Sequence, residues 1–249
     1  MPSRVGWAVV LLLVLGHGTW PSLAGDQSPT MESPLRTALR LVLVETQGFD
    51  SSDAIIRTYE RKRADGAWHE VGLAAPAQIG KAGLGWGHTF RHLARAGEPV
   101  KQEGDKRAPA GIFAMGRPFG FRSSSLANYM QLKAGQHVCV DDVRSPHYSR
   151  VVDAQTAGAG TSGERMWDID IYRKGILVDY PTSRDAKSGS CIFVHLWRRA
   201  DTPTVGCVAV SEPTVDRLQA WANNPRDNAV IAIVPSTARA RLSGLPQRP

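Results

Sequence analysis

The residues best suited to chemistry lie near the C-terminal end, in the segment CIFVHLWRRADTPTVGCVAVSEP, residues 191–213. His195 stands in an apolar run, and Cys207 follows Gly206 twelve positions later, beyond a polar loop that contains proline. A thiol is weakly ionised at neutral pH, so it attacks a carbonyl when a neighbouring base takes its proton. The segment therefore indicates a cysteine nucleophile and a histidine base, with backbone N–H groups near Gly206 and Cys207 to hold an oxyanion. A buried core histidine and an inert buried thiol are the alternative, which spacing alone leaves open.

A strand and a returning turn are the elements that would bring these two side chains together. The run 190–197 predicts a buried strand, in which Cys191 and His195 share one face about 13 Å apart. That distance is too long for a hydrogen bond, so Cys191 is not the thiol that His195 activates. The polar loop that follows contains residues typical of turns, and it can return the chain so that Cys207 lies beside His195.

The first 24 residues have the pattern of a secretory signal peptide. A basic start with Arg4 precedes a short apolar run over 5–15, and Ser22 and Ala24 are the small residues of a cleavage site. We expect export to the periplasm or cell envelope; an uncleaved N-terminal anchor is the alternative, and no other stretch predicts a membrane span. Removing Arg4 lowers the formal charge from +7 to +6, which suits anionic envelope partners; the Lys and Arg residues are scattered, so nucleic acid is not expected.

The three cysteines are Cys139, Cys191 and Cys207. In an oxidising compartment an odd number suggests one disulfide and one free thiol. Since Cys191 cannot reach His195 along its own strand, we expect Cys139 and Cys191 to be joined or adjacent, which leaves Cys207 free. The alternative is that both are buried free thiols that pack as small apolar groups.

The length of 249 residues and the hydrophobic content of 42% predict one sizeable domain. Many short strands and few helices favour a mainly β fold, a sandwich or a barrel. We expect a flexible linker over 25–37, the domain over 38–236 and a tail over 237–249. Ser211 is the expected N-cap of one helix. The predicted strands are 39–45, 55–61, 68–71, 77–79, 111–116, 138–143, 166–172, 176–178, 190–197 and 228–234.

The segment VHLWRRADTPTVGCVAVSEP resembles the active-site segment of the L,D-transpeptidase catalytic domain, the YkuD-like family. The family signature is a histidine, a loop, then Ser or Thr, a variable residue, Gly and the nucleophilic Cys. Here those positions are His195 and 204–207. The upstream RAPAGIF at 107–113 is similar to the family's P-x-G-x-F segment, and EGDKRAPAG, CVDD and GSCIFVH are similar to one branch from bacterial envelopes. The resemblance covers roughly 38–235.

The resemblance implies a β-rich domain that remodels peptidoglycan by binding its stem peptides. Cys207 would attack the carbonyl between the L-centre of diaminopimelate and the terminal D-alanine of a tetrapeptide, which releases D-alanine and leaves a thioester. An amine of another stem or water would then attack that thioester. His195 would act as base and acid, Gly206 would support the oxyanion, and the backbone carbonyl of Leu196 would orient the imidazole. The family's chemistry requires neither a metal nor an organic cofactor, and the sequence does not predict an oligomeric state.

The chain departs from the family pattern at three positions. Many members carry a histidine before the glycine and an arginine two residues after the cysteine, where this chain has Val205 and Ala209. Tyr180 stands where related sequences often carry histidine. Thr204 and Val205 are expected to contact substrate, so these changes bear on the donor pocket and on the choice between amine and water.

Other residues have weaker interpretations. His88 and His92 have the i, i+4 spacing of a helical metal site, but no third ligand is evident nearby. Asp141 and Asp142 would position a cationic substrate group, although a solvated turn or a structural hydrogen bond is favoured. Three tryptophans are assigned to packing or to a glycan groove: Trp86, Trp167 and Trp197.

Two other classes of function stay open at this stage. One is an exported cysteine endopeptidase of another fold, which would place its cysteine before its histidine in the chain, the reverse of the order found here. The second is a non-catalytic peptidoglycan-binding module. Labelling with a carbapenem, a thiol-reactive β-lactam, would distinguish binding from catalysis.

Overall fold

The structure is a computed structural model that describes Met1 and residues 33–224 and 226–247. Apart from Met1, the predicted signal peptide over 1–24 lies outside the described residues, as does most of the predicted linker over 25–37. The fold described here is therefore that of the part that follows.

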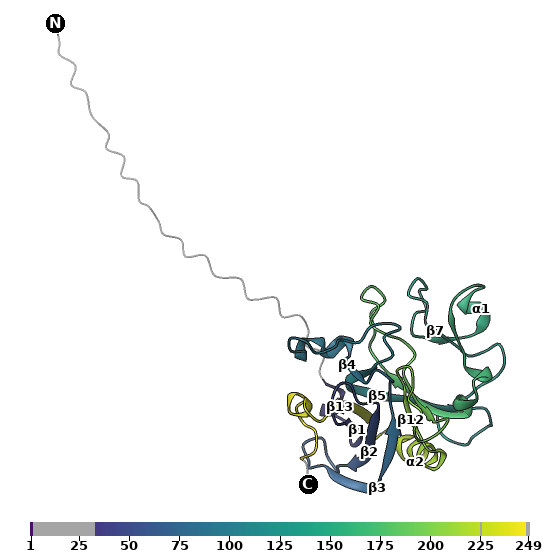
Figure 1. Ribbon diagram of the computed structural model, residues 1–249, viewed down its shortest axis with the longest axis horizontal. Helices are drawn as coiled ribbons and strands as arrows, with labels where there is room; N and C mark the ends of the chain where they lie inside the picture. Colours follow the sequence, from purple (N-terminus) through teal and green to yellow (C-terminus); the bar gives the residue numbers. More distant parts are fainter. Residues whose placement is uncertain (2–32, 225, 248–249) are drawn as a thin grey trace. The chain divides into compact units, whose positions relative to one another are not determined.

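Eight strands close into a barrel, because β5 pairs with β13 on one side and with β10 on the other. The mainly β class predicted from the sequence is confirmed, and of the two architectures left open the barrel is the one observed. The barrel strands, in the order in which they pair, are β10 (Lys174–Asp179), β11 (Phe193–Leu196), β12 (Val208–Val210), β3 (His69–Gln78), β2 (Asp53–Glu60), β1 (Arg40–Thr46), β13 (Ala229–Pro235) and β5 (Ala108–Gly120) (Figure 1).

The other described elements are short. Two strands add to β5, namely β4 (Leu84–Trp86) and β6 (Met130–Gln131). A separate small sheet contains β8 (Val151–Val152), β7 (Val138–Val140) and β9 (Gly163–Arg165). The helices are η1 (Pro34–Arg36), η2 (His88–Leu93), α1 (Ala154–Ala157), η3 (Met166–Asp168), η4 (Asp170–Arg173), α2 (Glu212–Ala222) and η5 (Arg239–Arg241). Over the described residues, none of these helices has the length and hydrophobicity needed to span a membrane.

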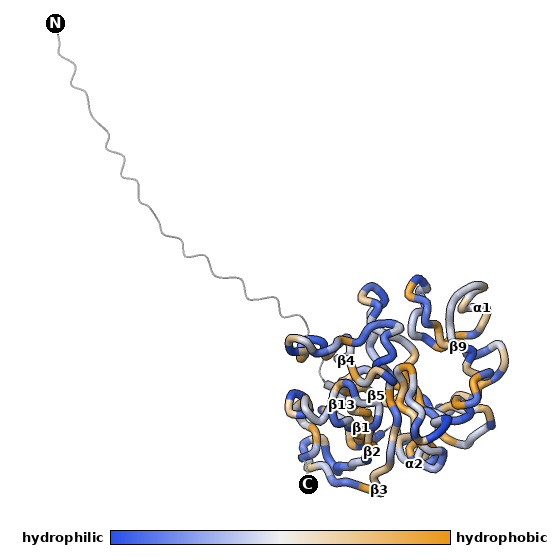
Figure 2. Tube along the Cα trace, viewed as in Figure 1, coloured by the Kyte–Doolittle hydropathy of each residue, from blue (hydrophilic) through white to orange (hydrophobic). Residues whose placement is uncertain are grey.

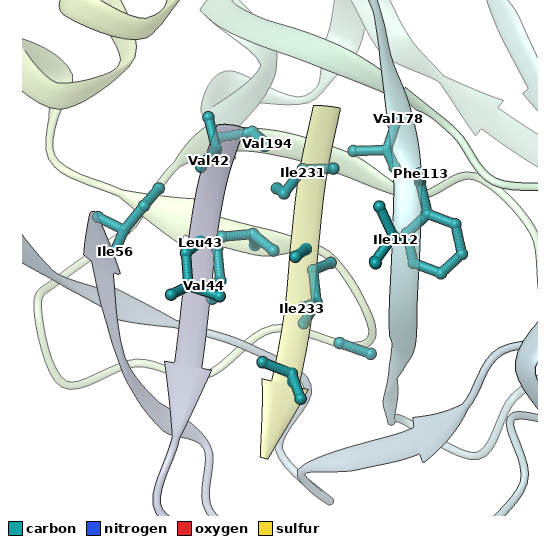
Figure 3. Close-up of a cluster of buried hydrophobic side chains, with 14 of the residues drawn as sticks. Val42, Leu43, Val44, Ile56, Ile112, Phe113, Val178, Val194, Ile231 and Ile233 are labelled. Atoms are coloured by element: carbon teal, nitrogen blue, oxygen red, sulfur yellow. The ribbon is translucent and has the colours of Figure 1, made fainter. Parts of the chain in front are cut away.

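The core lies around β1 and β13, which pair in parallel over their whole lengths. Every residue of β13 is buried, and so are five of the seven residues of β1. Strands buried on both faces contain continuous apolar runs, here 41–44 in β1 and all of β13. Hydrophobic residues gather on the barrel strands and hydrophilic residues along the loops (Figure 2). Figure 3 shows the side chains at the centre: Val42, Leu43, Val44, Ile56, Ile112, Phe113, Val178, Val194, Ile231 and Ile233.

Residues near both ends of the segment 33–247 pack against this core, which the polar composition of 25–37 and 237–249 did not indicate. Leu35 and Leu242 are only 3% and 5% exposed. The Arg241 guanidinium also forms an ion pair with Glu98 at 2.7 Å. Single apolar residues in polar segments carry no periodic signal. The predicted linker and tail therefore each include a residue that belongs to the folded domain.

The predicted helix after Ser211 is confirmed as α2. The Ser211 side chain accepts a hydrogen bond from the Thr214 N–H, and Val215 and Leu218 are buried against the core. This helix begins directly after β12, so its cap fixes the end of the strand that follows Cys207.

Several predicted strands differ from the structure in length. The predicted strand 138–143 is shorter, since only Val138–Val140 forms a strand, β7. The predicted strands 68–71 and 77–79 are parts of one strand, β3, whose register with β2 shifts between Val71 and Ala75, around Gly72. The predicted strand 111–116 belongs to the longer β5.

The predicted strand over 166–172 is wrong: this segment forms the two 3-10 helices η3 and η4. The alternation of apolar and acidic residues suggested a strand, but here it separates buried from exposed positions along successive tight turns. Met166 and Tyr172 are buried, whereas Asp168 and Asp170 are exposed. The difference matters for function because η4 carries Tyr172 to the candidate site.

A disulfide joins Cys139 of β7 to Cys191, which confirms the predicted pairing and leaves Cys207 as the free thiol. The bridge spans 52 positions of sequence. It ties the small sheet to the segment that enters β11, the strand of His195.

Removing this bridge is expected to lower the free energy of unfolding by roughly 3–4 kcal/mol, since the unfolded chain regains the entropy of a long loop. Equilibrium denaturation of the Cys139→Ser, Cys191→Ser double variant measures this loss. Thiol counting on denatured, unreduced wild-type protein should find one free thiol per chain, located at Cys207 by peptide mapping. Three free thiols, or a disulfide that includes Cys207, would contradict the pairing.

Candidate active site

Two neighbouring parallel strands position the predicted nucleophile and base. In the register of β11 with β12, Val194 lies opposite Val208 and His195 opposite Ala209. Cys207 directly precedes β12, so it lies diagonally across from His195. Both side chains line one pocket of about 150 Å³. The structure thus brings together the two residues that the sequence singled out.

The alternation predicted for the run 190–197 is confirmed, although only 193–196 is paired as a strand. Ile192 and Val194 belong to the barrel core. Cys191 and Phe193 face the other way, into a second cluster that also contains Cys207. The odd-numbered face of this strand is therefore the face of the candidate site.

His195 is held in the tautomer that a general base requires. Its Nδ1–H donates to the Leu196 carbonyl oxygen at 2.8 Å, which leaves Nε2 as an acceptor. This is the contact that the family resemblance implied for Leu196. Burial lowers the pKa of His195 to about 4; the Leu196 hydrogen bond opposes this shift, and the charge of Arg198 adds to it. The imidazole is therefore neutral at neutral pH and able to accept a proton.

Cys207 is a buried free thiol whose sulfur is hydrogen-bonded to the backbone. Its S–H donates to the Cys191 carbonyl oxygen, and the Phe193 N–H donates to its sulfur, each at 3.4 Å. Burial, together with the nearby Glu164 carboxylate, raises the pKa of this thiol well above its usual range. Among the hydrogen bonds of the described residues, none joins Sγ to His195. The thiol must therefore turn from the Cys191 carbonyl before His195 can take its proton.

Thr204 shapes the turn that presents Cys207. Its hydroxyl donates to the Cys207 carbonyl oxygen at 2.7 Å and accepts from the Gly206 N–H at 3.0 Å. The Gly206 N–H is thus directed to Thr204 and would have to leave it to support an oxyanion. Gly206 has a φ of +156°, and a side chain there would meet the Arg107 carbonyl oxygen at 3.2 Å. Thr204 and Val205 both line the pocket, and Val205 is 68% exposed.

The upstream RAPAGIF segment supports this turn from behind. Arg107 donates to the carbonyl oxygens of Phe49 and Leu84 and forms an ion pair with Asp50 at 3.1 Å. Its own carbonyl faces Gly206, as the close approach above shows. The segment therefore acts through the backbone that packs against the turn before Cys207.

No family model, curated protein or solved structure matches this chain. Functional assignment therefore depends on the site residues themselves.

Sequence reasoning missed two residues behind the pocket, Tyr172 and Glu164. The Tyr172 ring packs edge-on against the His195 ring with centroids 5.3 Å apart. Its hydroxyl donates to Glu164 Oε2 at 2.7 Å. Burial raises the pKa of Glu164 to about 7, and the Tyr172 hydrogen bond only partly offsets that rise. No sequence motif marks either residue, because helix η4 and the separate sheet bring them to the site.

Arg198 is a third residue that the sequence did not single out, since it stood in a loop assigned to turn formation. Its side chain lines the pocket next to Trp197. It is exposed, and no hydrogen bond or ion pair within the described residues engages its guanidinium. The neighbouring Arg199 differs, because it pairs with Asp201 at 3.0 Å. Arg198 is thus a cation available to an anionic group in the pocket.

The positions that depart from the family pattern have distinct places. Ala209 lines the pocket beside Val205. Tyr180 lies in the barrel core, where its hydroxyl donates to the Ser188 carbonyl oxygen at 2.6 Å and its ring packs edge-on against Phe113. Tyr180 is therefore part of the scaffold, whereas Val205 and Ala209 form part of the pocket wall.

The histidine pair at 88 and 92 is not on an α-helix but on the 3-10 helix η2, where an i, i+4 pair does not share a face. His88 lies against the guanidinium of Arg91, and His92 is exposed. No group of three or more His, Cys, Asp and Glu side chains suited to a metal ion occurs within the described residues.

The remaining predicted residues are structural or peripheral. Asp142 pairs with Arg144 at 2.9 Å, whereas Asp141 Oδ1 is buried without a hydrogen-bond partner in the described structure. Of the three tryptophans, only Trp197 lines the pocket. Trp86 is buried and donates to Glu98, and Trp167 is partly buried against the small sheet.

A second pocket, of about 250 Å³, is lined by residues of β5, β10 and α2. Its lining includes Arg117 and Gln219 but no histidine, cysteine or carboxylate. Despite its larger volume it contains no group for acyl transfer, so the smaller pocket at Cys207 is the candidate active site.

Proposed function

We propose that this protein is an exported L,D-transpeptidase of the YkuD-like family that remodels peptidoglycan through a Cys207 acyl-enzyme. The observation that carries the proposal is the pairing of Cys207 and His195 in one pocket, with His195 Nδ1 held by the Leu196 carbonyl. The resemblance of His195 and residues 204–207 to the family signature supports the substrate class, and the predicted signal peptide supports export.

The reaction begins when the thiol turns from the Cys191 carbonyl toward the imidazole. His195 Nε2 takes the thiol proton, and the Leu196 carbonyl stabilises the resulting imidazolium. The sulfur attacks the carbonyl of the stem peptide, and the C–N bond to D-alanine breaks as His195 returns the proton to the leaving nitrogen. A thioester on Cys207 remains.

The second half of the reaction regenerates the thiol. An amine of a neighbouring stem attacks the thioester and loses its proton to His195, which passes it to the departing sulfur. The new amide is the cross-link. If water attacks in place of the amine, the product is a free tripeptide, and the protein acts as an L,D-carboxypeptidase.

Arg198 is the residue in the pocket best suited to recognise the stem peptide. Stem peptides carry free carboxylates, and a guanidinium binds a carboxylate through two parallel hydrogen bonds. The family pattern supplies an arginine at the position of Ala209, where this chain has no charge. We infer that Arg198 takes over that role from the loop.

Mass spectrometry of muropeptides after incubation with the purified mature protein tests the proposed function. Cross-linked dimers and free D-alanine are the expected products from tetrapeptide substrate. Tripeptide without cross-links would replace the transpeptidase assignment with L,D-carboxypeptidase action. Cleavage at another bond would favour a different wall-peptide hydrolase, and binding without any product or carbapenem adduct would favour a non-catalytic module.

Replacing Arg198 with alanine is expected to raise the KM for tetrapeptide substrate at least about tenfold, because a hydrogen-bonded charge pair with substrate is lost. Steady-state release of D-alanine measures KM and kcat separately. Arg199→Ala is the matched control, since the neighbouring guanidinium already pairs with Asp201. Equal KM values for the two variants would exclude Arg198 as the carboxylate-binding residue.

A further inference from the structure

A buried tyrosine and a carboxylate lie directly behind the nucleophile, and the mechanism above leaves them without a role. Tyr172 is 3% exposed and lines the same pocket as Cys207 and His195. Its hydroxyl donates to Glu164 at 2.7 Å in the resting state. Tyr172 and Cys207 belong to the same buried cluster. Burial and then the nearby thiol raise the pKa of Tyr172, whereas the tyrosine hydroxyl opposes the rise that burial causes in the pKa of Cys207.

We propose that Tyr172 is a further catalytic side chain whose hydroxyl hydrogen-bonds the ionised sulfur of Cys207, and that Glu164 is its positioning residue. This inference rests on the proposed function, in which Cys207 is the nucleophile. When Glu164 is ionised, it accepts a hydrogen bond from the Tyr172 hydroxyl and holds that hydroxyl away from the sulfur. When Glu164 is protonated, the Tyr172 hydroxyl is free to donate to the thiolate.

Charge supports this division of roles. A thiolate at Cys207 and a carboxylate at Glu164 repel each other in a buried site, so forming the first is easier when the second is neutral. The Glu164 charge accordingly raises the pKa of the Cys207 thiol. Burial raises the pKa of Glu164 to about 7, which makes its neutral form accessible near neutral pH.

Other charged groups also shift the pKa values of Glu164 and Cys207, some upward and some downward. Asp141 and Glu103 face Glu164 and further raise its pKa. Lys101 is the cation that lowers the pKa of Cys207. Lys101 is itself buried and paired with Asp105 at 2.5 Å.

The disulfide fixes the geometry on which this arrangement depends. Glu164 of β9 lies opposite Cys139 of β7 in the small sheet. Cys139 is bonded to Cys191, and the Cys191 carbonyl accepts the resting thiol of Cys207. Glu164 is thus paired with one cysteine of the disulfide, and the Cys207 sulfur is hydrogen-bonded to the other.

Alkylation of Cys207 by iodoacetamide between pH 5.5 and 9 tests the proposal without requiring any enzymatic turnover. The full mature protein is used unreduced, so that Cys207 is the reactive thiol. We expect the wild-type rate to rise about tenfold per pH unit up to about pH 7 and then to flatten as Glu164 ionises. Glu164→Gln mimics the neutral acid, so its rate should keep rising about tenfold per pH unit and exceed the wild-type rate about a hundredfold at pH 9.

The same alkylation experiment on Tyr172→Phe tests the role of the hydroxyl. Its alkylation should be about tenfold slower than wild type below pH 7, where the hydroxyl is free to donate, and the difference should narrow above pH 7. Asp168→Asn, an exposed carboxylate near Glu164 in sequence, is the control and should follow the wild-type profile. Circular dichroism of each variant checks that it folds.

Two results would overturn the proposal. One is a wild-type alkylation rate that rises up to pH 9 without flattening. This result does not depend on the folding of any variant. The other is a flattening that persists unchanged in Glu164→Gln. Failure of the proposed function is distinguishable, since it appears as absent muropeptide products while the alkylation profile still shows the expected flattening.

Discussion

Replacing Cys207 with alanine is expected to abolish release of D-alanine from tetrapeptide muropeptides and to prevent labelling by a carbapenem. The proposed chemistry passes through a thioester on this sulfur, and Cys139 and Cys191 are joined in a disulfide, so no other thiol can take over. Loss of a covalent nucleophile removes the reaction path itself, which makes this the largest effect we predict. Muropeptide analysis by mass spectrometry measures the product, and intact-protein mass measures the adduct.

The fold should survive this change. Cys207 is 5% exposed and its sulfur makes two long hydrogen bonds, so truncation to alanine should cost about 1–2 kcal/mol of stability. Thermal unfolding followed by circular dichroism provides the control. A folded Cys207→Ala variant that still forms product at the wild-type rate would show that the nucleophile has been assigned to the wrong residue.

Replacing His195 with alanine is expected to reduce turnover by about two orders of magnitude or more, the usual worth of a general base. In the proposed mechanism the neutral imidazole accepts the thiol proton and returns it to the leaving nitrogen. Among the described residues, no other histidine lines the pocket that could take over either step. The rate of acylation by a carbapenem near neutral pH isolates the first of these steps. His92→Ala is the control, because that histidine is exposed on η2, outside the pocket.

A normal acylation rate in the folded His195→Ala variant would remove His195 from the role of base. A normal acylation rate is more informative here than a lowered one, because loss of a buried ring also perturbs packing against Tyr172. The comparison of acylation with full turnover separates proton transfer from substrate binding.

Much of the barrel follows from local pattern. β1 contains the apolar run 41–44 and β13 is apolar throughout, and short runs of this kind that are rich in β-branched residues favour a buried strand. The face of His195 was predictable for the same kind of reason, since alternation along a strand is a property of the backbone. The pairing of β1 with β13 was not predictable, because sequence pattern does not state which distant strand is the neighbour.

Only the two residues proposed to carry the chemistry of the site were predictable from the sequence. His195 and Cys207 carry chemistry that restricts their roles, and the turn between them has recognisable residues. Tyr172 and Glu164 carry no such signal: their proximity to Cys207 depends on η4, where the alternating sequence suggested a strand, and on the register of β9 with β7. Contacts of this kind come from tertiary structure and leave no trace in spacing.

Closure of the barrel has a consequence for how the site can move. β11 lies between β10 and β12, and β12 between β11 and β3, so both strands of the site have neighbours on each side. A shift of one residue in either strand would turn its side chains to the opposite face and would have to break two ladders at once. The register of the two strands that carry the candidate site is therefore protected against slippage. We therefore expect the backbone amides of β11 and β12 to exchange slowly, and any opening of the pocket to come from the exposed residues around Arg198 and Val205.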